Sequence, residues 1–212
     1  MHKTLHYVFD PLCGWCYGAS AALSALAEHP GITLHMLPSG LFSDAGARPM
    51  DDAFADYAWS NDQRIERLTG QRFSERYRSR VLADRQQRFD SGPATLALTA
   101  VALTAPQREP QALQALQGAR YVEGQDTTRL DTLTALWAGL GLGAAAALLA
   151  QPDAALLQAN RARVGQAQAL LHAFGARGVP TFILEQHGQR QLLPASAAYA
   201  DPRTFVEQLA AA

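Results

Sequence analysis

The pattern of apolar and polar positions predicts a strand, a helix and a second strand at the start of the chain. Residues 4–9 (TLHYVF) alternate and are rich in aromatic and β-branched types, which favours a strand ending at Asp10. Over residues 16–28, Ala and Leu recur at helical spacing, and HPG at 29–31 ends the helix. Residues 32–38 (ITLHMLP) form the next predicted strand. The chain therefore opens as β-α-β.

The middle of the chain carries a helical pattern. From about residue 50 to 174 we find no strand pattern, only helix-period segments separated by Gly, Pro and Asp. Residues 91–105 are apolar nearly all round, which predicts a buried central helix with Ser91 or Gly92 as its cap. A second long helix is expected over 153–174. This block predicts an all-helical insertion.

The end of the chain returns to strands. Residues 179–185 and 190–194 predict two short strands joined by a hairpin, and a final helix begins at Asp201, its expected cap. The order is β-α-β, helices, β-β-α, which is a thioredoxin fold of the α/β class with a large helical insertion.

We expect three segments along the chain. They are the first half of the thioredoxin fold at 1–45, the helical insertion at 46–175 and the second half of the thioredoxin fold at 176–212. With 212 residues the chain is long enough for one folding unit with an elaboration, but short for two independent domains.

Composition narrows the function classes. The chain is 48% hydrophobic and 17% charged with a net charge of -1, so it lacks the basic excess that nucleic-acid binding requires. Its apolar stretches, such as residues 139–150, are Ala- and Gly-rich and too short to span a bilayer. The N-terminus has no signal-peptide pattern, which predicts a cytoplasmic protein.

The chemistry points to Cys13 and Cys16, the only 2 cysteines of the chain. Two cysteines three residues apart at a helix start can face each other and form a readily reduced disulfide. The first lies where the unpaired N–H groups and the helix dipole stabilise a thiolate, so Cys13 is the expected nucleophile and Cys16 the resolving thiol. Gly14 keeps the turn open, and Trp15 offers an apolar surface to a substrate peptide.

A metal site and a purely structural role for the cysteine pair have weaker support. A zinc site would need further ligands, but there is no second CxxC and the 6 histidines show no metal-ligand spacing. A purely structural pair would not require the strand-turn-helix context. Thiol redox chemistry is therefore favoured, with no metal and no cofactor beyond the redox-active disulfide itself.

A second motif lies at RGVPTFIL, residues 177–184, where a Pro directly before a strand suits a cis X-Pro turn. Together, FDPLCGWCY and GVPTFIL resemble the DsbA-type thiol-disulfide oxidoreductases, and the large insertion resembles their FrnE-like cytoplasmic branch. The resemblance implies that Pro180 is a cis-proline lying against the CxxC. It also implies that the backbone of Val179 pairs with an extended substrate.

The sequence departs from that family at two positions. Strongly oxidising members carry a His directly before the second cysteine, where this chain has Trp15, so a potent oxidase is not expected. Many relatives bury an acid on the first strand to relay the proton of the resolving cysteine, but this chain has Tyr7 there. Asp10, His6 or water are then the candidate proton relays, although Asp10 is equally explained as a turn residue.

These observations predict a thiol-disulfide oxidoreductase or isomerase that exchanges disulfides with proteins, peptides or small thiols, with glutathione as a candidate co-substrate. The alternative is a glutathione-dependent kappa-type transferase or isomerase, which has a similar element order but uses Ser rather than a cysteine pair. A third hypothesis is a non-catalytic binding or chaperone module whose insertion holds a partner. The substrate and the oligomeric state do not follow from the sequence.

Overall fold

A four-stranded sheet forms the centre of the computed structural model, which describes residues 3–211, so Met1, His2 and Ala212 at the ends of the predicted outer segments lie outside it. The strand order is β2-β1-β5-β6, with β1 parallel to β2 and antiparallel to β5, and with β5 antiparallel to β6. The strands span β1 Lys3–Phe9, β2 Ile32–Pro38, β5 Thr181–Gln186 and β6 Gln189–Leu193. This arrangement confirms the predicted thioredoxin fold.

The helix predicted after β1 is two helices in the structure. Helix α1 spans Gly14–Gly18 and α2 spans Ser20–Ala27, with Ala19 between them at φ -83° and ψ 1°. The helical spacing of Ala and Leu continues through this break, so the hydrophobic pattern alone could not reveal it. The helix also begins at Gly14 rather than Cys16, which makes Cys13 the residue that precedes the first turn.

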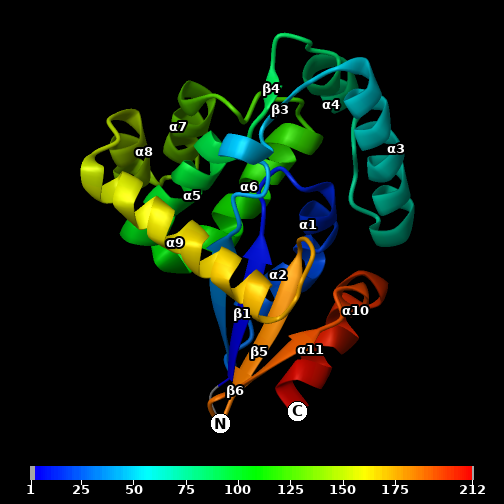
Figure 1. The fold of residues 1–212 in the computed structure, drawn as a ribbon, viewed down its shortest axis with the longest axis vertical. Helices are drawn as coiled ribbons and strands as arrows, with labels where there is room; N and C mark the ends of the chain where they lie inside the picture. The colour runs from blue at the N-terminus through cyan, green and yellow to red at the C-terminus, as the bar shows by residue number, and fades with distance from the viewer. Residues whose placement is uncertain (1–2, 212) are drawn as a thin grey trace.

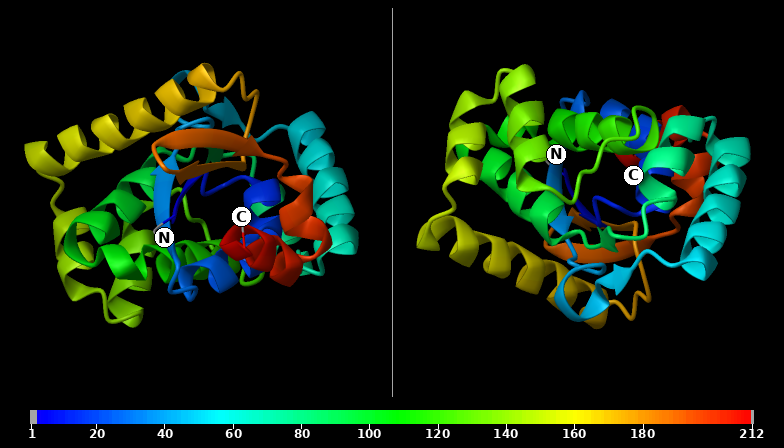
Figure 2. Two further views of the ribbon diagram at one scale, coloured as in Figure 1. Left: turned by 90° about the horizontal axis from the view of Figure 1, so that it is seen from below. Right: turned by 90° about the horizontal axis from the view of Figure 1, so that it is seen from above.

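The two faces of the sheet pack against different helices (Figure 2). Leu5, Tyr7 and Phe9 of β1 belong to the main core, together with residues of α2 and of α11, which spans Pro202–Ala211. Val8 belongs to a smaller core with residues of α9, which spans Ala154–Ala173. Successive side chains of a strand point to opposite faces, so β1 contributes to both cores.

Except for α9, the insertion lies above the sheet, beyond the end of β1 (Figure 1). Its buried centre is α5, which packs against α6, α7, α8 and α9 as the apolar pattern predicted. The helices that follow β2 span α3 Asp52–Thr69, α4 Glu75–Tyr77, α5 Gly92–Thr104, α6 Glu109–Tyr121, α7 Leu130–Gly139 and α8 Gly143–Ala150. Three short helical turns, Asp44–Gly46, Arg78–Leu82 and Pro106–Arg108, connect them.

Two details of the insertion differ from the sequence predictions. A two-stranded ladder joins β3 (Arg48–Pro49) to β4 (Arg88–Phe89) in a region expected to hold no strand, because two-residue strands are too short to show alternation. Ser91 precedes α5 as expected, but its side chain makes no capping bond and donates to Asp10 instead.

The remaining boundaries follow the sequence signals. His187 and Gly188 turn the β5–β6 hairpin with φ 53° and 73°, the left-handed conformation of a tight hairpin turn. Asp153 caps α9 by accepting a hydrogen bond from the Leu156 amide, and Asp201 accepts one from the Thr204 amide at the start of α11. Helix α10 (Ser196–Ala200) lacks a distinct sequence pattern.

Within residues 3–211, no helix is both long and apolar enough to cross a bilayer.

Candidate active site

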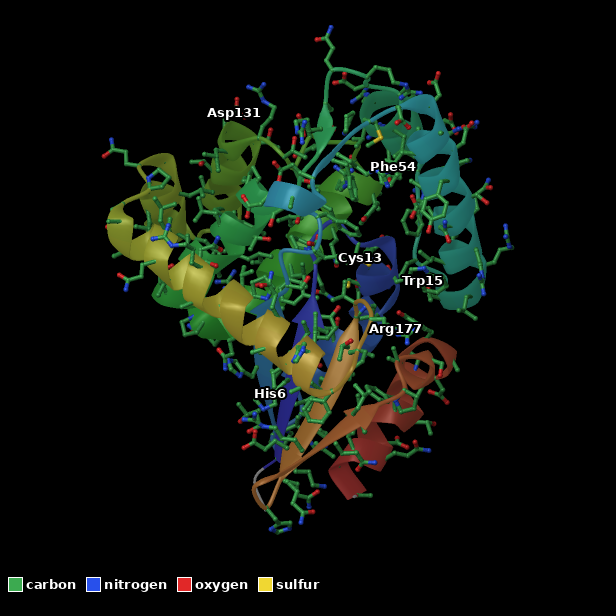
Figure 3. All side chains as sticks on the ribbon, in the orientation of Figure 1. His6, Cys13, Trp15, Phe54, Asp131 and Arg177 are labelled. Atoms are coloured by element: carbon green, nitrogen blue, oxygen red, sulfur yellow. The ribbon has the colours of Figure 1, made fainter. Side chains whose placement is uncertain are left out.

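Cys13 lies at the turn between β1 and α1, under the insertion (Figure 3). Cys13 directly precedes the helix and has 7% of its surface exposed, whereas Cys16, inside α1, is fully buried. Both are free thiols in this structure. Of the two cysteines only Cys13 keeps some exposed surface, so it is the one that a partner molecule can reach first.

Burial also changes the proton affinity of Cys16. Desolvation raises the pKa of the Cys16 thiol well above its ordinary value, and the hydrogen bond and negative charge of the neighbouring Cys13 raise it further. A hydrogen bond to the Asp10 backbone acts in the opposite direction. Beneath the pair, Tyr7 donates a 3.4 Å hydrogen bond to the Cys16 carbonyl oxygen. Cys16 is thus held as a thiol rather than a thiolate.

The structure brings the CxxC turn and the Gly-Val-Pro loop together. The Sγ atom of Cys13 lies 3.6 Å from the carbonyl oxygen of Val179, although the two residues are 166 positions apart. The peptide bond between Val179 and Pro180 is cis. Thr181 holds the loop from the other side through a 2.8 Å hydrogen bond to the Gly178 carbonyl oxygen.

Gly14 and Trp15, between the cysteines, contact other elements rather than open solvent alone. A Cβ atom on Gly14 would lie 2.6 Å from Oδ1 of Asp62 on α3, so only glycine fits there without displacing the carboxylate. The ring of Trp15 lies 5.3 Å from that of Tyr199, and the guanidinium of Arg64 lies 5.6 Å from its centroid. Trp15 is half-buried and presents part of its ring at the site.

Asp10 connects the CxxC turn to the insertion. Its Oδ1 accepts from the Leu12 amide at 3.0 Å, and its Oδ2 accepts from the Phe42 amide at 3.2 Å and the Ser91 hydroxyl at 2.7 Å. Complete burial raises the pKa of the carboxyl to about 6, while these hydrogen bonds lower it. The contacts give Asp10 a structural role, as the turn interpretation predicted, and a relay role remains a prediction.

The structure does not bring His6 to the cysteines. Its neighbour Tyr7 faces Cys16, so His6 points to the opposite face of the sheet. There its ring nitrogens contact His35 Nδ1 at 3.1 Å and Glu185 Oε2 at 2.8 Å. Figure 3 shows His6 beside the middle of β1, away from Cys13. These contacts give no support to a proton relay from His6 to Cys16.

A pocket of about 270 Å³ opens beside Cys13. One wall comes from the CxxC turn, and another comes from α3 through Phe54, Asn61 and Asp62. The remainder is largely aromatic, including Tyr77 and Tyr121. A partly apolar pocket with a few converging polar groups is typical of a small-molecule or peptide side-chain site.

Asp62 and Arg120 are buried charged residues that the sequence analysis did not identify. Asp62 is 5% exposed, and its Oδ2 accepts a 3.0 Å hydrogen bond from the Tyr77 hydroxyl. Burial raises the pKa of this carboxyl to about 7, against the opposing effects of the Tyr77 hydrogen bond and the Arg120 charge. A detectable signal existed, because Asp62 shares a helix face with the buried Ala55 and Ile65.

Arg120 is fully buried behind the aromatic wall of the pocket. Its guanidinium lies within 6 Å of three ring centroids, at 5.6 Å from Tyr77, 5.5 Å from Phe89 and 5.9 Å from Tyr121. None of its side-chain nitrogens has a hydrogen-bond partner among residues 3–211. Its charge lowers the pKa of both Asp10 and Asp62. The guanidinium is therefore a buried positive charge that both carboxyls share.

No cluster of three or more His, Cys, Asp or Glu side chains within residues 3–211 is arranged to hold a metal ion. The arrangement that remains is a dithiol with one accessible and one buried sulfur, next to a backbone carbonyl and a pocket. Its chemistry is nucleophilic attack by the first sulfur on a disulfide and resolution by the second.

Comparisons with known proteins agree with this arrangement. A family model described as a DSBA-like thioredoxin domain matches residues 4–209. The cytosolic disulfide reductase DsbM from Pseudomonas aeruginosa is similar, with 36% identity, a TM-score of 0.88 and coverage of 99% of this chain and 100% of that chain.

Two further solved structures place the similarity in context. The same Pseudomonas aeruginosa reductase with GSH matches at 33% identity and a TM-score of 0.81, covering 97% of this chain and 98% of that chain. The oxidoreductase DsbA from Xylella fastidiosa, at 13% identity and a TM-score of 0.52, covers 98% of this chain and 87% of that chain, and shows the fold alone. No curated protein matches the chain.

Proposed function

The chain belongs to the DSBA-like thioredoxin domain family and is a thiol-disulfide oxidoreductase, and we propose that it works as a disulfide reductase with glutathione as its thiol co-substrate. One observation carries the proposal. The sulfur of Cys13 lies at a pocket and against the Val179 carbonyl, while the resolving thiol Cys16 is completely buried beneath it.

The proposed mechanism follows from that difference in exposure. The thiolate of Cys13 attacks a substrate disulfide, forms a mixed disulfide and releases one substrate thiol. Cys16 then attacks Cys13 Sγ, which releases the second substrate thiol and leaves the Cys13–Cys16 disulfide. Val179 and Pro180 border the nucleophile, where an extended substrate would pair with the Val179 backbone. Gly14 and Trp15 complete the proposed substrate surface.

The direction of the reaction is inferred from Trp15 and from a relative. A positively charged side chain beside Cys13 would stabilise its thiolate and make the disulfide more oxidising. Trp15 carries no charge, and the relative DsbM is a disulfide reductase. We extend the same comparison to location and propose that the chain works in the cytosol, as DsbM does.

Glutathione is proposed because its two carboxylates suit the cations around the site. Arg48 lines the pocket, Arg64 lies over the ring of Trp15, and Arg177 is exposed two positions before Val179 (Figure 3). The structure of DsbM with GSH supports the same choice. The Arg-rich segment at 72–89 contributes less, because Arg76 and Arg85 pair with Glu123 and Asp52.

Proton transfer to Cys16 is assigned to Asp10, whose backbone already bonds with the thiol. The Cys16 thiolate formed when the disulfide is reduced has a high proton affinity and takes up a proton readily. An ionisable carboxyl with a pKa of about 6 next to the turn suits this transfer.

The first test equilibrates the protein in glutathione redox buffers, quenches with an alkylating agent and counts labelled thiols by intact mass. We expect Cys13 and Cys16 to convert together in a two-electron transition at a reducing midpoint. A pair that never forms a disulfide at any ratio, or a midpoint as oxidising as that of a dedicated oxidase (about -120 mV), contradicts the proposal.

Replacement of the resolving cysteine separates this function from glutathione-dependent transfer or isomerisation. Cys16→Ser should leave the Cys13 thiol free to attack but unable to resolve, so a mixed disulfide between Cys13 and glutathione accumulates and shows in the intact mass. A transferase that needs only one nucleophile would keep its turnover in the same variant.

A further inference from the structure

We propose that Asp62, on helix α3, exchanges a proton with the substrate thiol that reacts at Cys13. The inference rests on the proposed function and adds a catalytic residue to it. It starts from geometry, because Asp62 is the acidic side chain of the pocket that Cys13 also lines.

The position of the carboxylate is fixed from two sides. Its Oδ2 accepts the 3.0 Å hydrogen bond from the Tyr77 hydroxyl, which leaves Oδ1 directed at the CxxC turn. There the absent Cβ of Gly14 would lie 2.6 Å from Oδ1, which places this oxygen against the residue next to the nucleophile. No hydrogen bond to Oδ1 is found within residues 3–211. Asp62 thus has one carboxylate oxygen that the Tyr77 hydrogen bond does not occupy, and it lines the same pocket as Cys13.

The charged and titratable groups around Asp62 come from several elements. Arg120 is the nearest buried cation, and its effect lowers the pKa of Asp62 without cancelling the effect of burial. The other groups that share the pocket or its wall are Cys13 before α1, Arg48 of β3, Tyr57 of α3, Tyr77 of α4 and Tyr121 of α6. With the pKa of Asp62 at about 7, both its protonated and ionised forms are populated near neutral pH.

The proposed step is the attack of glutathione on the Cys13–Cys16 disulfide. The sulfur of glutathione forms a bond to Cys13 Sγ, the Cys13–Cys16 bond breaks, and its electron pair leaves on Cys16. The proton of the glutathione thiol moves to the Asp62 carboxylate, and the Cys16 thiolate takes up a proton from the Asp10 carboxyl, the donor proposed above. In the opposite half-reaction, when Cys13 attacks a substrate disulfide, protonated Asp62 donates to the leaving thiolate.

A base at this position has a clear advantage. A small thiol with an ordinary pKa of about 8.5 is mostly protonated at neutral pH, and only its thiolate is an effective nucleophile. A carboxylate that removes the proton as the sulfur attacks raises the rate, and the most effective base has a pKa near the working pH. Asp62 combines that pKa with a place in the substrate pocket.

The test follows reduction of the Cys13–Cys16 disulfide by glutathione between pH 5.5 and 9, with timed alkylation and intact mass. In the wild type we expect a rise in rate near pH 7 as Asp62 ionises, before the rise from ionisation of glutathione itself. Asp62→Asn should remove the first rise and slow the reaction at least tenfold at pH 7.5. Asp56→Asn, which removes an exposed carboxylate from the same helix, should keep both the rate and the profile.

A second variant keeps the test decisive if Asp62→Asn disturbs folding. Tyr77→Phe removes the hydrogen bond that lowers the pKa of Asp62, so the first rise should move to higher pH. An unchanged profile in Asp62→Asn, or an unmoved rise in Tyr77→Phe, overturns the role of Asp62. If glutathione fails to reduce even the wild type, the proposed function falls as well, which separates the two failures.

Discussion

Helix α3 packs closely against the CxxC turn at Gly14. At the first position of a helix, Ala is ordinarily better than Gly by up to about 1 kcal/mol. Here a methyl group would lie 2.6 Å from Asp62 Oδ1 and 3.1 Å from Ile65 Cδ1, so these buried side chains of α3 must shift. We expect Gly14→Ala to lower the free energy of unfolding by about 1–3 kcal/mol, measured by urea denaturation.

Gly165 supplies the matched control for this substitution. It lies exposed in the interior of α9, and a Cβ atom there would have no neighbour within 4 Å. Gly165→Ala should therefore stabilise the protein by about 1 kcal/mol. If Gly14→Ala and Gly165→Ala stabilise the protein to the same extent, the packing of α3 does not require glycine at position 14.

We expect the uncharged side chain of Trp15 to influence the redox potential of the dithiol. Replacing it with His would put an ionisable donor next to Cys13 and stabilise the reduced, thiolate form. The midpoint of Trp15→His should move to a more oxidising potential, by about 30 mV for each tenfold gain in the stability of the reduced form. Trp15→Phe, which adds no charge, should stay near the wild-type value in the same glutathione titration.

Some site residues can be identified from the sequence alone, and others cannot. Cys13, Cys16 and Pro180 sit in local motifs, so their juxtaposition follows from the fold. Asp62 and Arg120 lie on helix faces with apolar neighbours, and only the tertiary structure turns those faces towards the cysteines. A charged residue on an apolar helix face predicts a buried charge, but the sequence does not show which residues it contacts.

Between the elements, Arg163 of α9 joins three others. Its guanidinium donates to Glu109 of α6 at 2.5 Å, to the Met36 carbonyl of β2 at 2.9 Å and to Thr99 Oγ1 of α5 at 3.1 Å. Arg163→Met leaves the Glu109 carboxyl buried without its cation. We expect a loss of about 3–5 kcal/mol in urea denaturation, and partial recovery in the double variant with Glu109→Gln.

An exposed ion pair serves as the control for Arg163. Arg129 and Asp131 also lie 2.5 Å apart, but their side chains are 62% and 65% exposed, so water screens the attraction. Arg129→Met should leave the denaturation midpoint unchanged. If Arg163→Met is equally silent, the buried pair contributes nothing to the contact between α6 and α9.

The elements that the sequence predicts well are those with a long periodic pattern and a clear end. Helix α9 has Asp153 as its cap, and the β5–β6 hairpin has a Gly turn. The sequence does not predict the break at Ala19, because the helical spacing of apolar residues continues across it. It does not predict the ladder between β3 and β4, because two-residue strands are too short to show an alternating pattern. Both differences are local, and the predicted order of strands and helices in the thioredoxin fold is correct.

Across the whole molecule, the active site is built from parts distant in sequence. The dithiol comes from the first half of the thioredoxin fold, the Val179–Pro180 loop from the second, and a wall of the pocket from the insertion. Three buried carboxyls accompany this assembly: Asp10 beneath the turn, Asp62 at the pocket and Glu109 beside Arg163. Burial raises their pKa values to about 6, about 7 and about 6.

These shifts give the stability of the fold a defined dependence on pH. The folded protein keeps protons on the three carboxyls up to pH 6–7, whereas the unfolded chain releases them near its ordinary pKa values of 3.8 and 4.5. Between about pH 4 and 7 these three carboxyls therefore bind more protons in the native state than in the unfolded state, so their contribution makes the free energy of unfolding fall as pH rises, against the opposing contribution of His35, whose pKa burial lowers. Each such proton contributes a slope of about 1.4 kcal/mol per pH unit. Urea denaturation from pH 5 to 7.5 should show this decline. Asp62→Asn should flatten it, because the neutral amide removes one of the three titrating groups. A wild-type free energy of unfolding that rises over this range would contradict the burial of the three carboxyls.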